Sequence, residues 1–121
     1  MLGGMCFDAN AQTLKNYAKQ RNQELAERQR MEKTNYEKAC QKNTLAAYNE
    51  YLSMYPKGKY VQDVRKRVAE IERKNEQDLY DYAAKVETAQ AYEAYLKKYP
   101  NGRFAQEARV RIPAIAVHQF R

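Results

Sequence analysis

The segment TLAAYNEYLSMYPKGKYVQDVRKRVAEI (Thr44–Ile71) recurs 44 residues later as TAQAYEAYLKKYPNGRFAQEARVRIPAI (Thr88–Ile115). The two copies align without a gap, and 12 of their 28 positions are identical. A fixed period of this length is typical of repeat architectures, in which each period is one supersecondary unit. The sequence therefore predicts an all-α fold: a short helical-repeat array of two 44-residue units that follows a long N-terminal helix.

Each copy carries the start, the packing stripe and the end of one helix. Thr44 and Thr88 stand where an N-cap is expected, since a threonine hydroxyl can accept a free backbone N–H. Apolar residues then recur at i, i+4 and i+7, which places them on one helix face and predicts a core role for Tyr48, Leu52, Tyr55, Tyr92, Leu96 and Tyr99. Pro56 and Pro100 end the helix, because proline disfavours the helical conformation of the residue before it.

A second helix follows a short turn in each copy. Gly58 and Gly102 are expected to supply the positive φ of a tight reversal. The helix after the turn carries an apolar stripe formed by Val61, Val64, Val68 and Ile71 in one copy and by Ala105, Ala108, Ile112 and Ile115 in the other. The stretch Glu72–Asp78 has neither an apolar residue nor a helix breaker. We interpret it as a solvated part of one continuous helix that runs to about Val86.

The N-terminal part differs from the repeated part. Residues 12–35 lack proline and glycine and hold few apolar side chains, which predicts an exposed helix. Residues 1–11 end in Ala-Asn-Ala before Gln12, the small-residue pattern that signal peptidase cleaves. We interpret them as a signal-peptide remnant, with a frayed cytosolic N-terminus as the alternative.

The C-terminal part breaks the symmetry of the two copies. Pro113 stands at the position of Ala69 and cannot donate a backbone hydrogen bond to Arg109. It is therefore expected to kink or end the last helix. No stretch of the sequence reaches the roughly 20 apolar residues that a transmembrane helix needs, so none is predicted.

Composition favours a protein partner over nucleic acid. The net charge is +7, but basic and acidic residues are interspersed: residues 63–87 hold six basic and seven acidic side chains. A nucleic-acid-binding protein usually gathers its basic residues on one face or in one stripe. Alternating charges are instead typical of a solvated helix surface.

The sequence predicts no catalytic, cofactor or metal site. His118 is the only histidine and has no partner motif, whereas such sites need several converging groups. Cys6 lies in the predicted signal remnant, and Cys40 corresponds to Ala84 of the second copy. Cys40 is therefore expected to be a small buried residue, and no intrachain disulfide is expected.

Seven residues are candidates for contact with a partner. Tyrosine is common in binding surfaces, and Tyr51 and Tyr95 widen the edge of the apolar stripe. Five cationic candidates flank the turn or the stripe of the second helix: Lys57, Lys59, Arg65, Arg103 and Arg109. Ordinary surface charge is the alternative interpretation of these five.

The pattern Tyr-x-x-Tyr-Leu-x-x-Tyr-Pro-x-Gly-x-Tyr/Phe resembles the degenerate tetratricopeptide-type repeats of bacterial envelope proteins. Similar stretches occur in the outer-membrane assembly lipoprotein and in the periplasmic coordinator of the Tol-Pal system. The resemblance implies two repeats, at residues 36–79 and 80–121, in an exported protein of the periplasm or outer membrane. The 44-residue period is longer than the roughly 34 residues of a standard unit, and no family partner can be carried over.

The leading hypothesis is thus a non-catalytic module that binds another protein in the bacterial envelope. A cytosolic nucleic-acid-binding protein that uses the basic first helix is one alternative. A structural spacer for a further domain is another.

Overall fold

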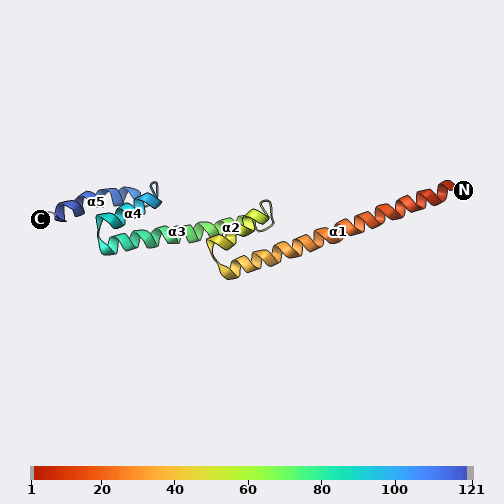
Figure 1. Cartoon of the computed structure of the whole chain (residues 1–121), viewed down its shortest axis with the longest axis horizontal. Coiled ribbons are helices and arrows are strands. Elements are labelled where there is room, and N and C mark those ends of the chain that lie inside the picture. Colours follow the sequence, from red (N-terminus) through yellow and green to blue (C-terminus); the bar gives the residue numbers. More distant parts are fainter. Residues whose placement is uncertain (1, 120–121) are drawn as a thin grey trace. The chain divides into compact units, whose positions relative to one another are not determined.

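The computed structural model describes residues 2–119, with side chains described for residues 10–115. The described chain consists of five α-helices and contains no strand (Figure 1). The helices are α1 (Leu2–Lys42), α2 (Leu45–Met54), α3 (Val61–Val86), α4 (Ala89–Lys98) and α5 (Ala105–Gln119). This confirms the predicted all-α class and the long N-terminal helix, and α3 runs without interruption to the predicted Val86.

The chain forms two compact units, unit 1 (Met1–Val64) and unit 2 (Arg65–Arg121). The division falls inside α3 because the two ends of this helix serve different cores. Val61 and Val64 are buried in unit 1, whereas Tyr80 and Ala83 are buried in unit 2.

The core of unit 2 is a small aromatic cluster covered by alanines. Tyr92 and Tyr95 of α4 are buried against Tyr80 of α3, and two alanines of α5, Ala105 and Ala108, complete the cluster. The Tyr80 ring stacks on Phe104, with centroids 4.4 Å apart, and meets Tyr95 edge-on at 5.5 Å. Alanines allow close approach of the helices, so the tyrosines supply most of the buried apolar area.

Unit 1 has a core of the same construction. The buried residues of unit 1 include Tyr48 and Tyr51 of α2, Val61 and Val64 of α3, and Ala39 of α1. Tyr36 of α1 stacks on Tyr60, with centroids 4.2 Å apart, as Tyr80 stacks on Phe104 in unit 2. Each contact pair lies 44 residues from its counterpart, so the repeated sequence forms corresponding contacts in both units.

The helix ends agree with the sequence prediction. The Thr44 hydroxyl accepts a hydrogen bond from the Ala47 N–H at 3.1 Å, and the Thr88 hydroxyl accepts one from the Ala91 N–H at 3.2 Å. These are N-cap bonds, which typically stabilise a helix by about 1 kcal/mol. The helices that they begin, α2 and α4, end two residues before Pro56 and Pro100.

The predicted role of the turn glycines is wrong in its mechanism. No glycine in the described chain has a positive φ. At Gly102 the constraint is steric, because no side chain fits there. A Cβ would lie 2.5 Å from the Tyr95 hydroxyl oxygen and 2.9 Å from Glu76 Oε2. A Cβ on Gly58 would likewise collide with Glu32 Oε1 and the Tyr51 hydroxyl.

Positive φ occurs at two other residues, which the sequence did not single out. Asn43 has φ 48° at the end of α1, and Glu87 has φ 51° at the end of α3. Their N–H groups donate to the carbonyls of Ala39 and Ala83 at 2.8 and 2.9 Å. Both residues thus end a helix in the left-handed conformation, which asparagine tolerates better than glutamate does.

We expect Glu87→Asn to raise the free energy of unfolding by on the order of 0.5–1 kcal/mol, because the substitution relieves the left-handed backbone. The substitution should also add a hydrogen bond. In unit 1 the Tyr48 hydroxyl donates to Asn43 Oδ1 at 2.9 Å, and an asparagine at position 87 would offer the same acceptor to Tyr92 in unit 2. Thermal denaturation followed by circular dichroism measures the change. Glu93→Asn, an exposed site within α4, is the control and should be neutral or slightly destabilising. Equal shifts for both variants would contradict the prediction.

Pro113 does not end the last helix. The helix α5 continues from Ala105 to Gln119 with Pro113 inside it. Proline leaves the Arg109 carbonyl without its helical donor. The side chains of Arg109, Val110 and Pro113 are exposed here, so water can reach this side of the helix and satisfy the carbonyl.

Candidate functional site

Tyr51 and Tyr95, predicted at the edge of a binding face, lie inside the units. Their exposed fractions are 1% and 0%. The Tyr51 hydroxyl accepts a hydrogen bond from the Tyr60 N–H at 3.1 Å, and the Tyr95 hydroxyl accepts one from the Phe104 N–H at 3.0 Å. The prediction that they face a partner is wrong, because Tyr51 packs against Tyr36 of α1 and Tyr95 packs against Tyr80 of α3. The Tyr51 and Tyr95 hydroxyls thus bind the backbone of the turn from within each unit.

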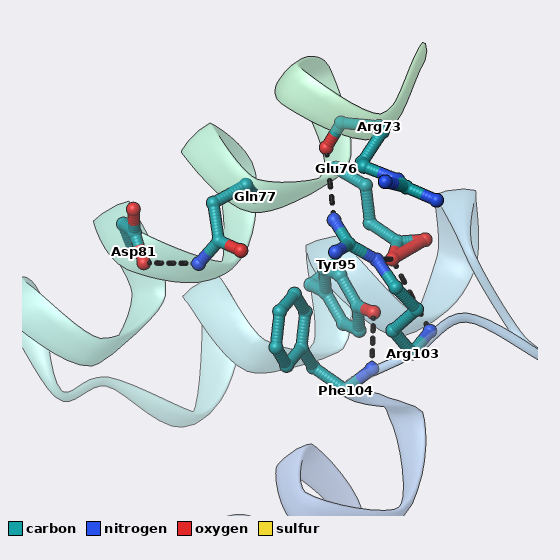
Figure 2. Close-up of polar contacts among 7 residues, drawn as sticks. All are labelled: Arg73, Glu76, Gln77, Asp81, Tyr95, Arg103 and Phe104. Atoms are coloured by element: carbon teal, nitrogen blue, oxygen red, sulfur yellow. Dashed lines mark hydrogen bonds and ion pairs between the residues drawn. The ribbon is translucent and has the colours of Figure 1, made fainter. Parts of the chain in front are cut away.

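A buried glutamate fixes the turn of unit 2. Figure 2 shows the Glu76 carboxylate of α3 beside Arg103. The Tyr95 hydroxyl lies at the backbone N–H of Phe104, the next residue of the turn. Glu76 Oε1 accepts from the Arg103 backbone N–H at 3.2 Å and from its Nε at 3.0 Å. The same guanidinium donates to the Arg73 carbonyl at 3.0 Å. Glu76 is 8% exposed, so these donors compensate the cost of burying its charge.

Glu32 performs the corresponding role in unit 1 with different donors. Its Oε1 accepts from the Lys59 backbone N–H at 2.6 Å and from the Tyr51 hydroxyl at 2.8 Å. The Lys59 ammonium is not used in this bond and lies 5.8 Å from the centroid of the Tyr60 ring. We call this set of groups, a helix glutamate, a tyrosine hydroxyl and the turn backbone, the turn clamp.

Sequence reasoning missed the glutamates of both turn clamps. Glu76 lies in the stretch expected to be solvated, and that part of the prediction is wrong. Each glutamate precedes its turn by 27 residues, so no local pattern connects them. One signal existed: Glu32 and Glu76 are identical residues at the same 44-residue offset as the repeated segments.

The turn clamps and cores raise the pKa of their tyrosines. Burial and the hydrogen bond to Glu32 raise the pKa of Tyr51 to about 12. Burial and a hydrogen bond to Glu107 raise the pKa of Tyr80 to about 12. Burial raises the pKa of Tyr95, and the hydrogen bond that Tyr36 donates to Asp63 raises the pKa of Tyr36. All four hydroxyls stay protonated at neutral pH and act as structural donors or acceptors.

These shifts predict loss of structure in alkali. The unfolded chain releases these protons near pH 10, whereas folded Tyr51 and Tyr80 keep theirs to about pH 12. The protonated tyrosines therefore contribute fully to the free energy of unfolding below pH 10. Between pH 10 and 12 that free energy falls by on the order of 1 kcal/mol for each tyrosine and each pH unit. Helix content measured against pH should fall in this window. The fall should be shallower for Tyr80→Phe and unchanged for Tyr17→Phe, an exposed control. Tyrosines that all ionise near pH 10 while the helices persist would contradict the prediction.

The five cationic candidates are divided between the two units, with Lys57 and Lys59 in unit 1 and Arg65, Arg103 and Arg109 in unit 2. Lys57 and Arg65 are exposed. Arg109 is exposed, and its guanidinium donates to the Pro100 carbonyl at 2.6 Å, bracing the turn of unit 2. Arg103 is half-exposed and forms an ion pair with Glu76. The backbone N–H of Lys59 donates to Glu32.

A shallow depression lies beside the turn in each unit, and we call these the turn depressions. The one in unit 1, of about 630 Å³, lies between α1 and the turn, and its lining includes Ala26, Gln29, Arg30, Glu32, Lys33 and Lys59. The one in unit 2, of about 280 Å³, is lined by Glu70, Arg73, Lys74, Gln77 and Arg103. Both are open to solvent. Their lining residues are mostly polar or charged, and the hydrocarbon parts of these side chains supply most of the exposed lining.

Among residues 10–115, no three histidine, cysteine or acidic side chains come together in a way that could hold a metal ion. Cys40 has a free thiol and is half-buried, which is less buried than predicted. Cys6 and His118 lie outside the residues whose side chains the structure describes.

Comparison of the chain with protein-family models, with curated proteins and with solved structures gave no match. None of the helices in the described chain is both long and apolar enough to cross a membrane.

Proposed function

We propose that this chain is a non-catalytic helical-repeat module that binds another protein in the bacterial envelope. Two tetratricopeptide-like units of 44 residues would form the module. One observation carries the proposal: the turn clamp is built twice, by corresponding residues, at the same place in each unit. In each unit, a helix carboxylate that accepts from a backbone N–H of the turn makes the turn rigid and presents the surface beside it in a defined geometry.

The chemistry of the buried groups supports binding rather than catalysis. Catalytic groups usually have pKa values moved towards neutrality, so that they can exchange protons at working pH. Here Tyr51, Tyr80 and Tyr95 have pKa values moved away from neutrality. Glu32 and Glu76 are occupied by the turns. These groups stabilise the scaffold and leave the exposed surface for recognition.

Export is supported by residues 1–11 and by the resemblance to envelope proteins. The test is the mass of the mature chain from fractionated bacterial cells that express the gene with its own upstream region. A chain that begins at Gln12 in the periplasmic or outer-membrane fraction supports export. A chain that stays in the cytoplasm uncleaved overturns this part of the proposal and leaves the binding role to its own test.

The binding role is tested by cross-linking in cells. A photoreactive amino acid is placed in turn at exposed positions on different faces, such as Lys15, Arg30, Lys57 and Arg109. We expect discrete protein adducts from some of these positions and none from others, and we expect them to survive nuclease treatment. Adducts that vanish on nuclease treatment favour a nucleic-acid partner. No adduct from any position overturns the proposal.

A further inference from the structure

The two turn depressions lie at corresponding positions in the two units. Every residue that lines the depression of unit 2 lies 44 residues after one that lines the depression of unit 1. The corresponding pairs are Ala26 and Glu70, Gln29 and Arg73, Arg30 and Lys74, Lys33 and Gln77, and Lys59 and Arg103. The turn clamp positions the last pair in both units, so the recurrence follows from the fold.

Both depressions carry the same balance of charge. Each is lined by three cationic side chains and one acidic one: Arg30, Lys33, Lys59 and Glu32 in unit 1, and Arg73, Lys74, Arg103 and Glu70 in unit 2.

The positive charge is largely free. Among the described residues, the side chains of Arg30, Lys59, Arg73 and Lys74 form no ion pair, and Lys33 has only an exposed contact of 3.9 Å with Glu37. Arg103 is the exception, since Glu76 neutralises it. The unpaired cations therefore favour an anionic ligand.

The aromatic residues nearby favour a protein ligand over nucleic acid. Proteins that bind single strands stack bases on exposed aromatic rings. The Tyr60 ring is already stacked on Tyr36 at 4.2 Å, and the Phe104 ring on Tyr80 at 4.4 Å.

Amide side chains line both depressions as well, with Gln29 in unit 1 and Gln77 in unit 2. They can pair with the peptide groups of an extended chain.

We propose that each turn depression binds an acidic segment of a partner protein, through its exposed arginine and lysine side chains. The inference rests on the proposed protein-binding function and adds the chemistry of the partner. The carboxylates of the segment would meet Arg30 and Lys33 in unit 1 and Arg73 and Lys74 in unit 2. These four side chains are exposed and have no part in the turn clamps, so they can be changed without disturbing the fold.

The test uses the full chain and a fluorescein-labelled peptide of repeating Glu-Ser-Ala. A labelled Gln-Ser-Ala peptide of equal length, which lacks the carboxylates, is the control ligand. Affinity is measured by fluorescence anisotropy at low salt. The variant Arg30→Glu/Lys33→Glu/Arg73→Glu/Lys74→Glu should bind the acidic peptide at least about tenfold more weakly, since several exposed ion pairs are lost together. The control Lys15→Glu/Lys19→Glu/Lys66→Glu/Lys97→Glu changes the net charge equally at exposed sites outside the depressions and should retain affinity within about threefold.

Circular dichroism establishes that each variant is folded. If charge reversal impairs folding, Arg30→Gln/Arg73→Gln replaces it and should weaken binding by about threefold or more. Equal weakening in the depression variant and the control would overturn the proposal, as would wild-type protein that does not distinguish the two peptides. A labelled oligonucleotide that binds more tightly than the peptide, and is lost in the depression variant alone, would also overturn it. Cross-links to a protein that persist without acidic-peptide binding would leave the proposed function standing and reject only this inference.

Discussion

Replacing Tyr95 with alanine should lower the free energy of unfolding of unit 2 by about 3–5 kcal/mol. The ring is fully buried and contacts Tyr80, Tyr99 and Phe104, with centroids 5.5, 5.6 and 6.3 Å away. Its removal leaves a cavity that small neighbours such as Ala105 and Ala108 cannot fill. A unit of this size has a total stability on the order of 3–9 kcal/mol, so the loss should unfold most of it.

The hydroxyl of Tyr95 can be separated from its ring. Tyr95→Phe keeps the ring and leaves the Phe104 N–H, now held at 3.0 Å, without its acceptor. Loss of one such bond, part-buried and neutral, should cost about 1–2 kcal/mol. The difference between the two variants then measures the ring alone.

The measurement is urea denaturation of the full chain, with hydrogen exchange to locate the lost structure in residues 89–115. Tyr82→Ala is the matched control, since Tyr82 belongs to the same unit but is 59% exposed, and it should change stability by less than about 0.5 kcal/mol. Similar losses for Tyr95→Ala and Tyr82→Ala would show that the buried tyrosine cluster is not what stabilises unit 2.

The parts of the fold that were predictable from sequence are those set by neighbours in the chain. Thr44 caps its own helix through a residue three positions away, and Pro56 acts on the residue before it. The continuous course of α3 follows from the absence of a breaker between Ile71 and Val86. Hydrophobic periodicity likewise placed Tyr48 and Tyr92 in the cores.

The candidate site was less predictable, because its contacts join residues that are distant in sequence. The pattern around Tyr51 shows an apolar edge, but its burial depends on the helices before and after it. Glu32 lies on a helix with many other charged side chains, most of them basic, and only the fold brings its carboxylate to the Lys59 N–H. Among the cationic candidates, Lys59 and Arg103 do line the turn depressions. Arg30 and Lys74 line them as well, but no local sequence pattern distinguishes these two residues from other surface cations.

The second large effect concerns Gly102, where two explanations give opposite results. Gly102→Ala should destabilise unit 2 by about 1–3 kcal/mol, because the new Cβ would lie 2.5 Å from the Tyr95 hydroxyl oxygen and 2.9 Å from both Glu76 Oε2 and Tyr99 Cβ. Three neighbours surround the position, and one is the buried carboxylate of the turn clamp. Relief by a small shift would therefore disturb the bonds to Arg103.

A comparison of Gly102→Ala with Gly102→Asn decides between space and backbone conformation. If glycine served to provide a positive φ, asparagine would be tolerated better than alanine. Because φ at Gly102 is not positive and the constraint is steric, asparagine should be at least as harmful as alanine. Asn101→Ala, at the exposed neighbouring position, is the control and should change stability by less than about 0.5 kcal/mol. The double variant Gly102→Ala/Tyr95→Phe should lose less than the sum of the two single changes, since it removes the oxygen nearest to the new Cβ. Strict additivity, or a milder effect of asparagine than of alanine, would mean that the turn is not held by the contact between Gly102, Tyr95 and Glu76.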